Sequence, residues 1–471
     1  MKRWNVAGRE QNSERLRVPQ PVIKRRIASG RGAMEQPNVT HDGEAAQNPR
    51  FWFALLLASV ATGLFGDFLM WVLREMEKLA FHYPGGSFQA AVAAVSGTRR
   101  VVVMVLAGVI GAVSWWLIRR YLGHEKSEID DALWAGDAEL GFRRSFLTSV
   151  VSEIVIGMGG SIGREAAPKL LGGAAGSTIS RWLHLSVAQR RLIVACAGGA
   201  GLACVYNVPL GGAIFTAEIL YGSFSLPVAT AALVSSSVAT VTAWLALPSH
   251  ATYGDVPEFH FTATLMTWSI PAGIVIGLVA VVFIRVIGWV SHYRAKGNQI
   301  LWMMPLTFLV VGLLGLPFPQ LFGNGKGIAH DALLGLGTSG FFLAMAILKP
   351  LTTTATVGSG AAGGLFTPFL ATGAALGAFL GMGWNHLWPG SPTGAFALVG
   401  AAAMLAASMQ APLCGLVIVM ELTHSGFTAI LPIMVATALA TYVVRTLDGY
   451  SIYSARLPGH PSATRTADPA P

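Results

Sequence analysis

The chain has 471 residues, of which 53% are hydrophobic and only 12% are charged, and its formal net charge is +9. A soluble domain carries roughly 25% charged residues, so a surface this poor in charge could not stay in water. The 55 glycines show no three-residue period, which excludes collagen, and the three cysteines form no spacing that would hold zinc. The composition therefore indicates an all-α membrane protein with many spans.

The two ends of the chain differ from the rest. Residues 1–50 contain ten Lys/Arg and five Asp/Glu and lead directly into an apolar segment. Because no aromatic stacking platform accompanies these charges, we expect a disordered basic cytoplasmic tail rather than a nucleic-acid-binding arm. No apolar stretch precedes residue 51, so we expect no cleaved signal peptide. Residues 458–471 form a second polar tail, and both termini are expected in the cytoplasm, with the protein in the cell (inner) membrane.

Apolar segments fill the sequence between these tails. They lie near 51–73, 101–118, 146–162, 168–183, 190–205, 209–221, 226–247, 264–292, 300–317, 328–338, 341–356, 366–384, 394–408, 411–422 and 427–445. A polar connector, 248–263, divides the chain into a first membrane half, 51–247, and a second, 264–457. Many segments are shorter than the roughly 20 residues that a spanning helix needs. Helices that stop inside a bilayer must be buried in protein or line a polar cavity, which predicts an ion or solute site near the midplane.

The two halves share a sequence pattern. Val208–Glu218 reads VPLGGAIFTAE and Ala411–Glu421 reads APLCGLVIVME, with a glutamate nine residues after the proline in both. Upstream of each block lies a glycine-rich break before a short helix, GREAAP at 163–168 and GGLFTP at 363–368. Related halves that meet at one site are typical of transporters, often with inverted topology. The sequence does not show the inversion itself.

The first helix start contains the strongest candidate, Glu165. A carboxylate inside a membrane is costly, about 2.5–3.5 kcal/mol on insertion scales, and so marks a functional site. The backbone N–H groups of Gly163, Arg164 and Ala166 are unpaired at such a start and attract an anion. We expect Glu165 to occupy this site when ionised and to leave it when protonated. The alternative is an ordinary first-turn acid paired with Arg164.

The second helix start offers the same unpaired donors at Gly364, Leu365 and Phe366. Here apolar bulk replaces charge, so N–H dipoles rather than any lysine or arginine would hold the ion. That arrangement suits flux, because a full positive charge would bind the ion too tightly to release it. The alternative is a glycine-rich packing bend.

Two enzyme readings compete with transport. Gly159–Gly163 matches the G-x-S-x-G nucleophile elbow, but that elbow needs a strand–turn–helix context that an apolar helical chain does not provide. An intramembrane serine protease would use Ser359 with a histidine, for which His424 is the nearest candidate. We expect no enzyme, no cofactor and no metal site.

These motifs resemble the CLC chloride channel and transporter family over residues 50–457. GREAAP at 163–168, SGAAGGLFTP at 359–368, the two Pro-Leu-x-Gly blocks and Ser451–Ala455 carry the resemblance. It implies a CLC-like fold of tilted and broken helices and a homodimer with one anion pathway per subunit. It implies a gating role for Glu165, backbone anion donors at Leu365 and Phe366, and a hydroxyl at Tyr453 that closes the inner side.

Two departures from the family pattern affect function. The first anion motif of the family falls at Gly123–Ser127, where His124 takes the place of the serine. The internal glutamate of coupled exchangers falls at Ile219, which cannot carry a proton, and Glu218 is a weak substitute with a more structural role. We expect transport of chloride or a similar small anion, coupled to protons through Glu165. The alternatives are a passive, pH-gated anion channel and, remotely, an intramembrane enzyme.

Overall fold

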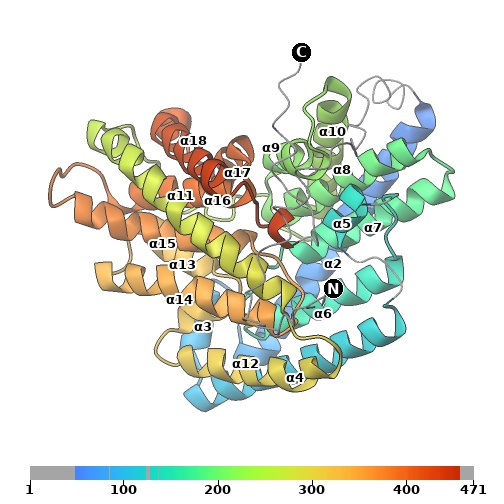
Figure 1. Cartoon of the computed structure of the whole chain (residues 1–471), viewed down its shortest axis with the longest axis horizontal. Helices are drawn as coiled ribbons and strands as arrows, with labels where there is room; N and C mark the ends of the chain where they lie inside the picture. The colour runs from blue at the N-terminus through green and yellow to red at the C-terminus, as the bar shows by residue number, and fades with distance from the viewer. Residues whose placement is uncertain (1–47, 84, 124–127, 136, 457–471) are drawn as a thin grey trace, which may run out of the picture. The chain divides into compact units, whose positions relative to one another are not determined.

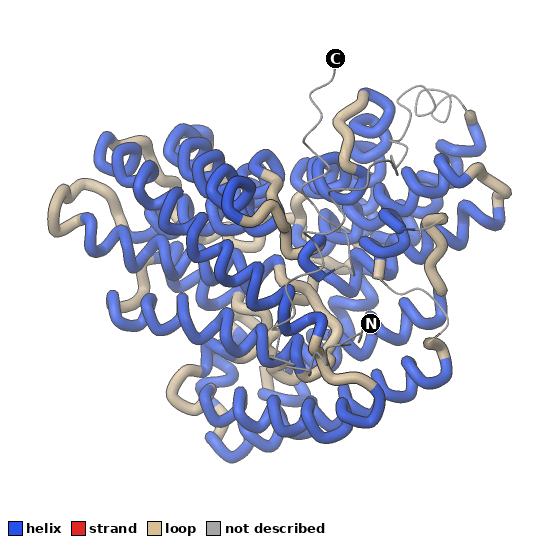
Figure 2. The backbone as a smooth tube through the Cα atoms, viewed as in Figure 1, coloured by secondary structure: helices blue, strands red, loops and turns tan. Residues whose placement is uncertain are grey.

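The computed structural model describes residues 48–456, except 84, 124–127 and 136, and this part of the chain folds almost entirely into helices (Figures 1 and 2). The helices of the first half are α2 (Pro49–Phe81), α3 (Phe88–Ala94), α4 (Gly97–Tyr121), α5 (Ile129–Ala135), α6 (Phe142–Gly157), α7 (Ala166–Trp182), α8 (Val187–Tyr206), α9 (Pro209–Phe215) and α10 (Leu226–Ala243). Those of the second half are α11 (Ala263–His292), α12 (Ile300–Leu314), α13 (Lys326–Leu334), α14 (Ser339–Gly358), α15 (Phe366–Trp384), α16 (Thr393–Met409), α17 (Pro412–Thr423) and α18 (Ile430–Leu447). The described residues contain no strand beyond one isolated bridge.

The predicted segments correspond to these helices with modest shifts at their ends. The first span is longer than predicted, 33 residues, because the helix continues past the apolar stretch to Phe81. The predicted segment 209–221 divides into α9 and a π-helix, Thr216–Tyr221. The helices α3 and α5 were not predicted, because each is only seven residues long. Residues between α10 and α11 form turns, in the region of the predicted connector.

Eight helical segments of the described part are long and apolar enough to cross a membrane. Large apolar side chains on these segments are exposed, among them Trp71, Val282 and Trp289. Such a surface is stable when hydrocarbon rather than water surrounds it, because apolar side chains and lipid tails need no hydrogen bonds with each other. The protein is therefore an integral membrane protein.

Glycine allows the shorter helices to pack closely inside the molecule. A Cβ on Gly400 of α16 would lie 2.7 Å from the Cα of Gly377 in α15, and a Cβ on Gly172 of α7 would lie 2.8 Å from the Thr62 side chain of α2. Small residues at helix contacts let backbones approach in membranes, where packing rather than the hydrophobic effect drives association. In Figure 1 helices α11 and α13–α18 gather on one side, and α5–α10 gather on the other.

Glu218 and Glu421 join the two halves by reciprocal caps. The Glu421 carboxylate accepts hydrogen bonds from the backbone N–H groups of Leu210 (3.1 Å) and Gly211 (2.6 Å) at the start of α9. The Glu218 carboxylate accepts one from the backbone N–H of Cys414, at 2.8 Å, at the start of α17. Each acid thus satisfies free donors at the helix start of the other half. The Pro-Leu-x-Gly block of each half thus supplies both an acid and the helix start that the other acid caps.

Candidate functional site

The two glycine-rich breaks meet at the centre of the described structure. The backbone N–H of Gly163 donates to the carbonyl of Gly364 at 2.8 Å, and the N–H of Gly364 donates to the carbonyl of Gly163 at 2.7 Å. This antiparallel bridge places the start of α7 beside the start of α15. The free N–H groups of two short helices therefore converge on one region, which is a favourable place for negative charge.

The side chain of Glu165 occupies this region. Its Oε1 accepts a hydrogen bond from the backbone N–H of Phe366 at 2.7 Å, and its Oε2 accepts one from the Thr367 hydroxyl at 3.2 Å. The Tyr206 hydroxyl lies 3.4 Å from the same Oε2 and 2.6 Å from the Thr367 hydroxyl oxygen. Only 5% of Glu165 is exposed. The carboxylate thus places its negative charge at the N-terminal start of α15.

The position of this carboxylate corrects the expectation that Glu165 would bind the backbone N–H groups of its own helix start. Glu165 is the N-cap residue of α7, yet its side chain makes no capping hydrogen bond there. The carboxylate reaches across to the other half instead, since the Gly163–Gly364 bridge brings the amide of Phe366 within range.

Both glycines of the bridge are needed for this approach. A Cβ on Gly163 or on Gly364 would overlap the Glu165 carboxyl group. A side chain at either position would therefore displace the carboxylate or force the two helix starts apart.

A small central cavity lies next to Glu165. Its volume of about 30 Å³ leaves room for a particle close to the size of a water molecule. Its lining includes Glu165, Ala166, Leu365 and Phe366, together with Tyr453. The Tyr453 ring packs edge-on against Phe215, with ring centroids 6.0 Å apart.

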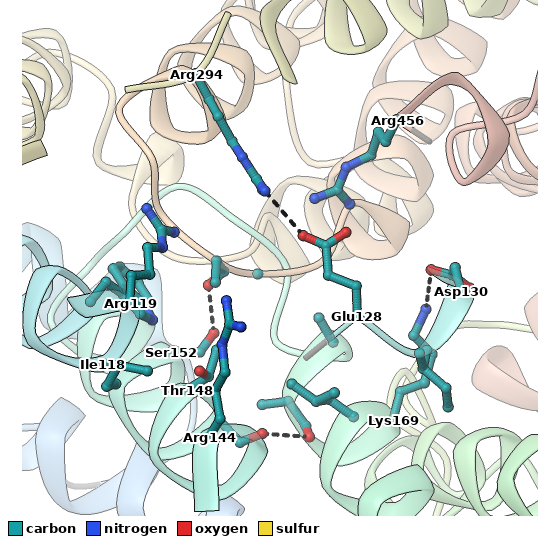
Figure 3. A pocket seen from close by; sticks show the side chains of 18 residues that line it. Ile118, Arg119, Glu128, Asp130, Arg144, Thr148, Ser152, Lys169, Arg294 and Arg456 are labelled. Carbon is teal, nitrogen blue, oxygen red and sulfur yellow. Dashed lines mark hydrogen bonds and ion pairs between the residues drawn. The ribbon is translucent and has the colours of Figure 1, made fainter. Parts of the chain in front are cut away.

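A basic cavity adjoins the central one. Its charged lining residues are Arg119, Glu128, Asp130, Arg144, Lys169, Arg294 and Arg456, five of them basic and two acidic. Figure 3 shows these side chains around the cavity, with Arg294 paired to Glu128 and Lys169 paired to Asp130. The excess of positive charge attracts anions towards the central cavity. Ala166, Lys169, Gly363 and Arg456 line both cavities and so mark the boundary between them.

A wide cavity of about 520 Å³ lies against the residues that flank Glu165 on the other side. Arg164 and Tyr206 line it, and the Arg164 guanidinium carbon lies 4.9 Å from the centroid of the Tyr206 ring. Glu165 and Tyr206 therefore separate the wide cavity from the central one.

The structure brings some of the predicted site residues together and separates others. Glu165, Ala166, Gly364, Leu365, Phe366 and Tyr453 share the central cavity. The Arg164 side chain lies in the wide cavity, and Gly163 contributes the backbone bridge. His124 lies outside the described residues. Glu218 caps α17 and is not among the residues that line the three cavities, and Ile219 is buried.

Four functional candidates were missed from the sequence. Lys169 and Arg456 line the central cavity, which corrects the expectation that amide dipoles alone would surround an ion there. Tyr206 contacts Glu165. Glu153 on α6 is completely buried, and neither carboxyl oxygen has a hydrogen-bond partner among the described residues. A carboxyl group in an apolar stretch is a signal that the sequence does contain.

The residues of the enzyme alternative make ordinary structural contacts. The hydroxyl of Ser359 donates to the carbonyl of Thr356 at 2.7 Å, within the last turn of α14. The Ser161 hydroxyl lies 3.0 Å from that of Thr352 and accepts a hydrogen bond from Lys349. His424 ends α17 in a left-handed conformation. In the described part of the chain no hydrogen bond joins either serine to a histidine.

Comparison with known proteins gives the family. The model of the voltage gated chloride channel family matches residues 110–445, well over half of the chain. The voltage-gated ClC-type chloride channel ClcB of Salmonella typhi is 30% identical over 411 residues, covering 84% of this chain and 95% of that protein. The ClcB of Citrobacter koseri is 31% identical over 389 residues, covering 80% and 92%. The chain belongs to the voltage-gated chloride channel (CLC) family, a family of transport proteins rather than enzymes.

Solved structures share the fold. A slow cyanobacterial Cl−/H+ antiporter superposes with a TM-score of 0.75 at 23% identity, covering 86% of this chain and 96% of that one. A CLC-type fluoride/proton antiporter superposes with a TM-score of 0.71 at 19% identity, covering 86% and 97%. At these identities the likeness concerns the fold, which is the CLC transporter fold.

Proposed function

We propose that this protein moves chloride or a similar small inorganic anion across the membrane and couples that movement to protons through Glu165. The observation that carries the proposal is the Glu165 carboxylate on the backbone N–H of Phe366, between the central and the wide cavity. A carboxylate and an anion bind the same N–H donors, so they compete for this site at the start of α15. The relatives named as chloride channels and antiporters support the same substrate class.

The three cavities supply the rest of the pathway. An anion gathers in the basic cavity, enters the central cavity past Tyr453 and Lys169, and binds the N–H groups at the start of α15 when Glu165 leaves. Protonation removes the charge of Glu165 and weakens its hold on the Phe366 amide, because charge-assisted hydrogen bonds are the stronger ones. Flux should therefore rise as the pH falls.

A passive, pH-gated anion channel is the second candidate. Ile219 favours it, because this residue stands where coupled exchangers of the family carry an internal glutamate and it cannot hold a proton. In that case Glu165 opens the pathway when protonated but carries no proton across.

Proteoliposome flux with simultaneous proton recording tests the proposal. Uphill proton movement driven by an anion gradient is the expected result, and Glu165→Gln should abolish it and flatten the dependence of anion flux on pH. Anion flux without proton movement would select the channel. Absence of any anion flux would reject both, and an unchanged response in Glu165→Gln would reject the role of Glu165.

We further propose a homodimer in the cell (inner) membrane, with both termini in the cytoplasm. The basic residues of 1–50 support this orientation through the positive-inside rule. The exposed Leu210 and Leu413, next to the reciprocal caps on α9 and α17, support a subunit contact there. Cysteine crosslinking at these positions in membranes tests the contact. Labelling of a cysteine introduced in the N-terminal tail tests the orientation.

A further inference from the structure

Lys169 stands at the boundary between the central and the basic cavity. It follows Glu165 by four residues, one turn along α7, so both side chains lie on the same side of that helix. Its side chain lines both cavities, and Figure 3 shows it next to Asp130. An anion that passes between the cavities therefore passes Lys169.

The contacts of Lys169 leave most of its binding capacity unused. Its Nζ lies 3.3 Å from Oδ2 of Asp130, 4.6 Å from the centroid of the Tyr453 ring and 5.9 Å from that of Phe215. An ammonium has three N–H donors, and within the described residues this one carboxylate oxygen is its hydrogen-bond acceptor. The side chain is 11% exposed, and that of Asp130 is 19% exposed. An anion in either of the two cavities that this side chain lines could accept hydrogen bonds from the remaining donors.

We propose that the Lys169 ammonium is a ligand for the transported anion and that Asp130 is its built-in competitor. The inference rests on the proposed function, because it assigns a second anion-binding site to the same pathway. When no anion is present, the Asp130 carboxylate holds Lys169. When an anion arrives from the basic cavity, it replaces Asp130 on the ammonium and is then next to Tyr453 and the helix starts.

Charge balance explains why a full positive charge is tolerated here. A lone ammonium in a cavity of low dielectric would bind an anion strongly and release it slowly. Asp130 offsets that charge, so the pair attracts an anion less strongly than Lys169 alone would. Asp130 lies on α5, 39 residues before Lys169, and the pair forms only when α5 packs against α7.

Other charged groups face the same space. Arg456 lines both cavities with Lys169, Glu165 lines the central one, and Glu128 lies in the basic one. Arg456 would also attract anions. The ion pair of Glu128 and Arg294 lies in the same basic cavity. The pair of Lys169 and Asp130 is the one that borders Tyr453 directly.

The inference predicts opposite effects for the two members of the pair. Chloride binding is measured by isothermal titration of the full-length purified protein with sodium chloride. Lys169→Met should weaken chloride binding at least about tenfold, as loss of a hydrogen bond to a charged group does, whereas Asp130→Asn should tighten it by about as much. Tighter binding cannot come from a misfolded protein. Lys296→Met, which removes an exposed charge, serves as the control.

Each other outcome contradicts a definite statement. Weaker binding in both Lys169→Met and Asp130→Asn would show a merely structural ion pair and overturn the inference. Wild-type affinity in Lys169→Met would overturn it as well, while leaving the proposed function intact. Absence of anion binding to the wild-type protein would overturn the proposed function itself, and the inference with it.

Discussion

Gly163 and Gly364 pair through two reciprocal backbone hydrogen bonds, 2.8 and 2.7 Å long, although they belong to different halves of the chain. The pair holds the starts of α7 and α15 against each other. Its consequence is the contact between Glu165 of one half and the Phe366 amide of the other. Because neither glycine has a side chain, the carboxylate can lie between the two turns.

Gly364→Ala is expected to displace the Glu165 carboxylate from the Phe366 amide. Its Cβ would overlap the Glu165 carboxyl group and enter the lining of the central cavity. The Glu165 side chain is flexible, so its carboxylate should shift away from the Phe366 amide, and the dependence of anion flux on pH should weaken. The measurement is anion efflux from proteoliposomes at several pH values. Gly383→Ala, at a position of α15 where a Cβ meets open space, should keep the wild-type pH dependence. Equal pH dependence in both variants would contradict the close approach.

Lys349 is expected to be structural. It is fully buried on α14, and its ammonium donates to the Ser161 hydroxyl (2.9 Å) and to the carbonyls of Leu321 (3.3 Å) and Gly323 (2.6 Å). Lys349→Met removes the donor of three buried hydrogen bonds and should lower the free energy of unfolding by about 1–3 kcal/mol. The thermal midpoint in detergent measures this loss. Lys296→Met is the exposed control, and a midpoint unchanged in Lys349→Met would show that the three contacts contribute nothing.

Glu218 and Glu421 are expected to stabilise the protein without carrying protons. Each caps a helix of the other half, and loss of a cap costs about 1 kcal/mol. Alanine at either position should therefore lower the thermal midpoint, while the number of protons moved per anion stays as in the wild type. Selective loss of proton movement in Glu218→Ala would instead identify Glu218 as the internal proton carrier.

Glu153 is expected to take part in proton movement. Residues Ser149, Ser152, Glu153 and Ile156 form one stripe of α6. Ser152 lines the basic cavity and Ile156 lines the wide one, so the buried Glu153 lies between the two along this helix. Glu153→Gln keeps the shape of the side chain but cannot exchange a proton. Proton movement should fall at least about tenfold, with anion flux largely retained.

The control for Glu153 is Glu75→Gln, which alters a glutamate of a surface ion pair with Lys78. A parallel loss of proton movement and anion flux in Glu153→Gln would indicate a structural role. Unchanged proton movement would exclude this residue from the proton route.

Local sequence was sufficient to predict most of the helices. Apolar runs between glycine and proline breaks gave α7, α8, α15 and α16 within a few residues, because helix ends depend on nearby breakers and caps. The same breaks, with an acid inside an apolar stretch, identified Glu165. Short polar helices such as α5 were missed, because tertiary packing rather than a long apolar run stabilises them.

What the sequence by itself determined is therefore the class of protein, the positions of the broken helices and the acid at the first of them. Tertiary structure decided which donors that acid uses. Glu165 binds the amide of Phe366 rather than those of its own helix, and Lys169 enters the pathway with Asp130 as its partner. These contacts join residues 201 and 39 positions apart. A local pattern records which face of a helix is apolar, but not which helix will lie against it.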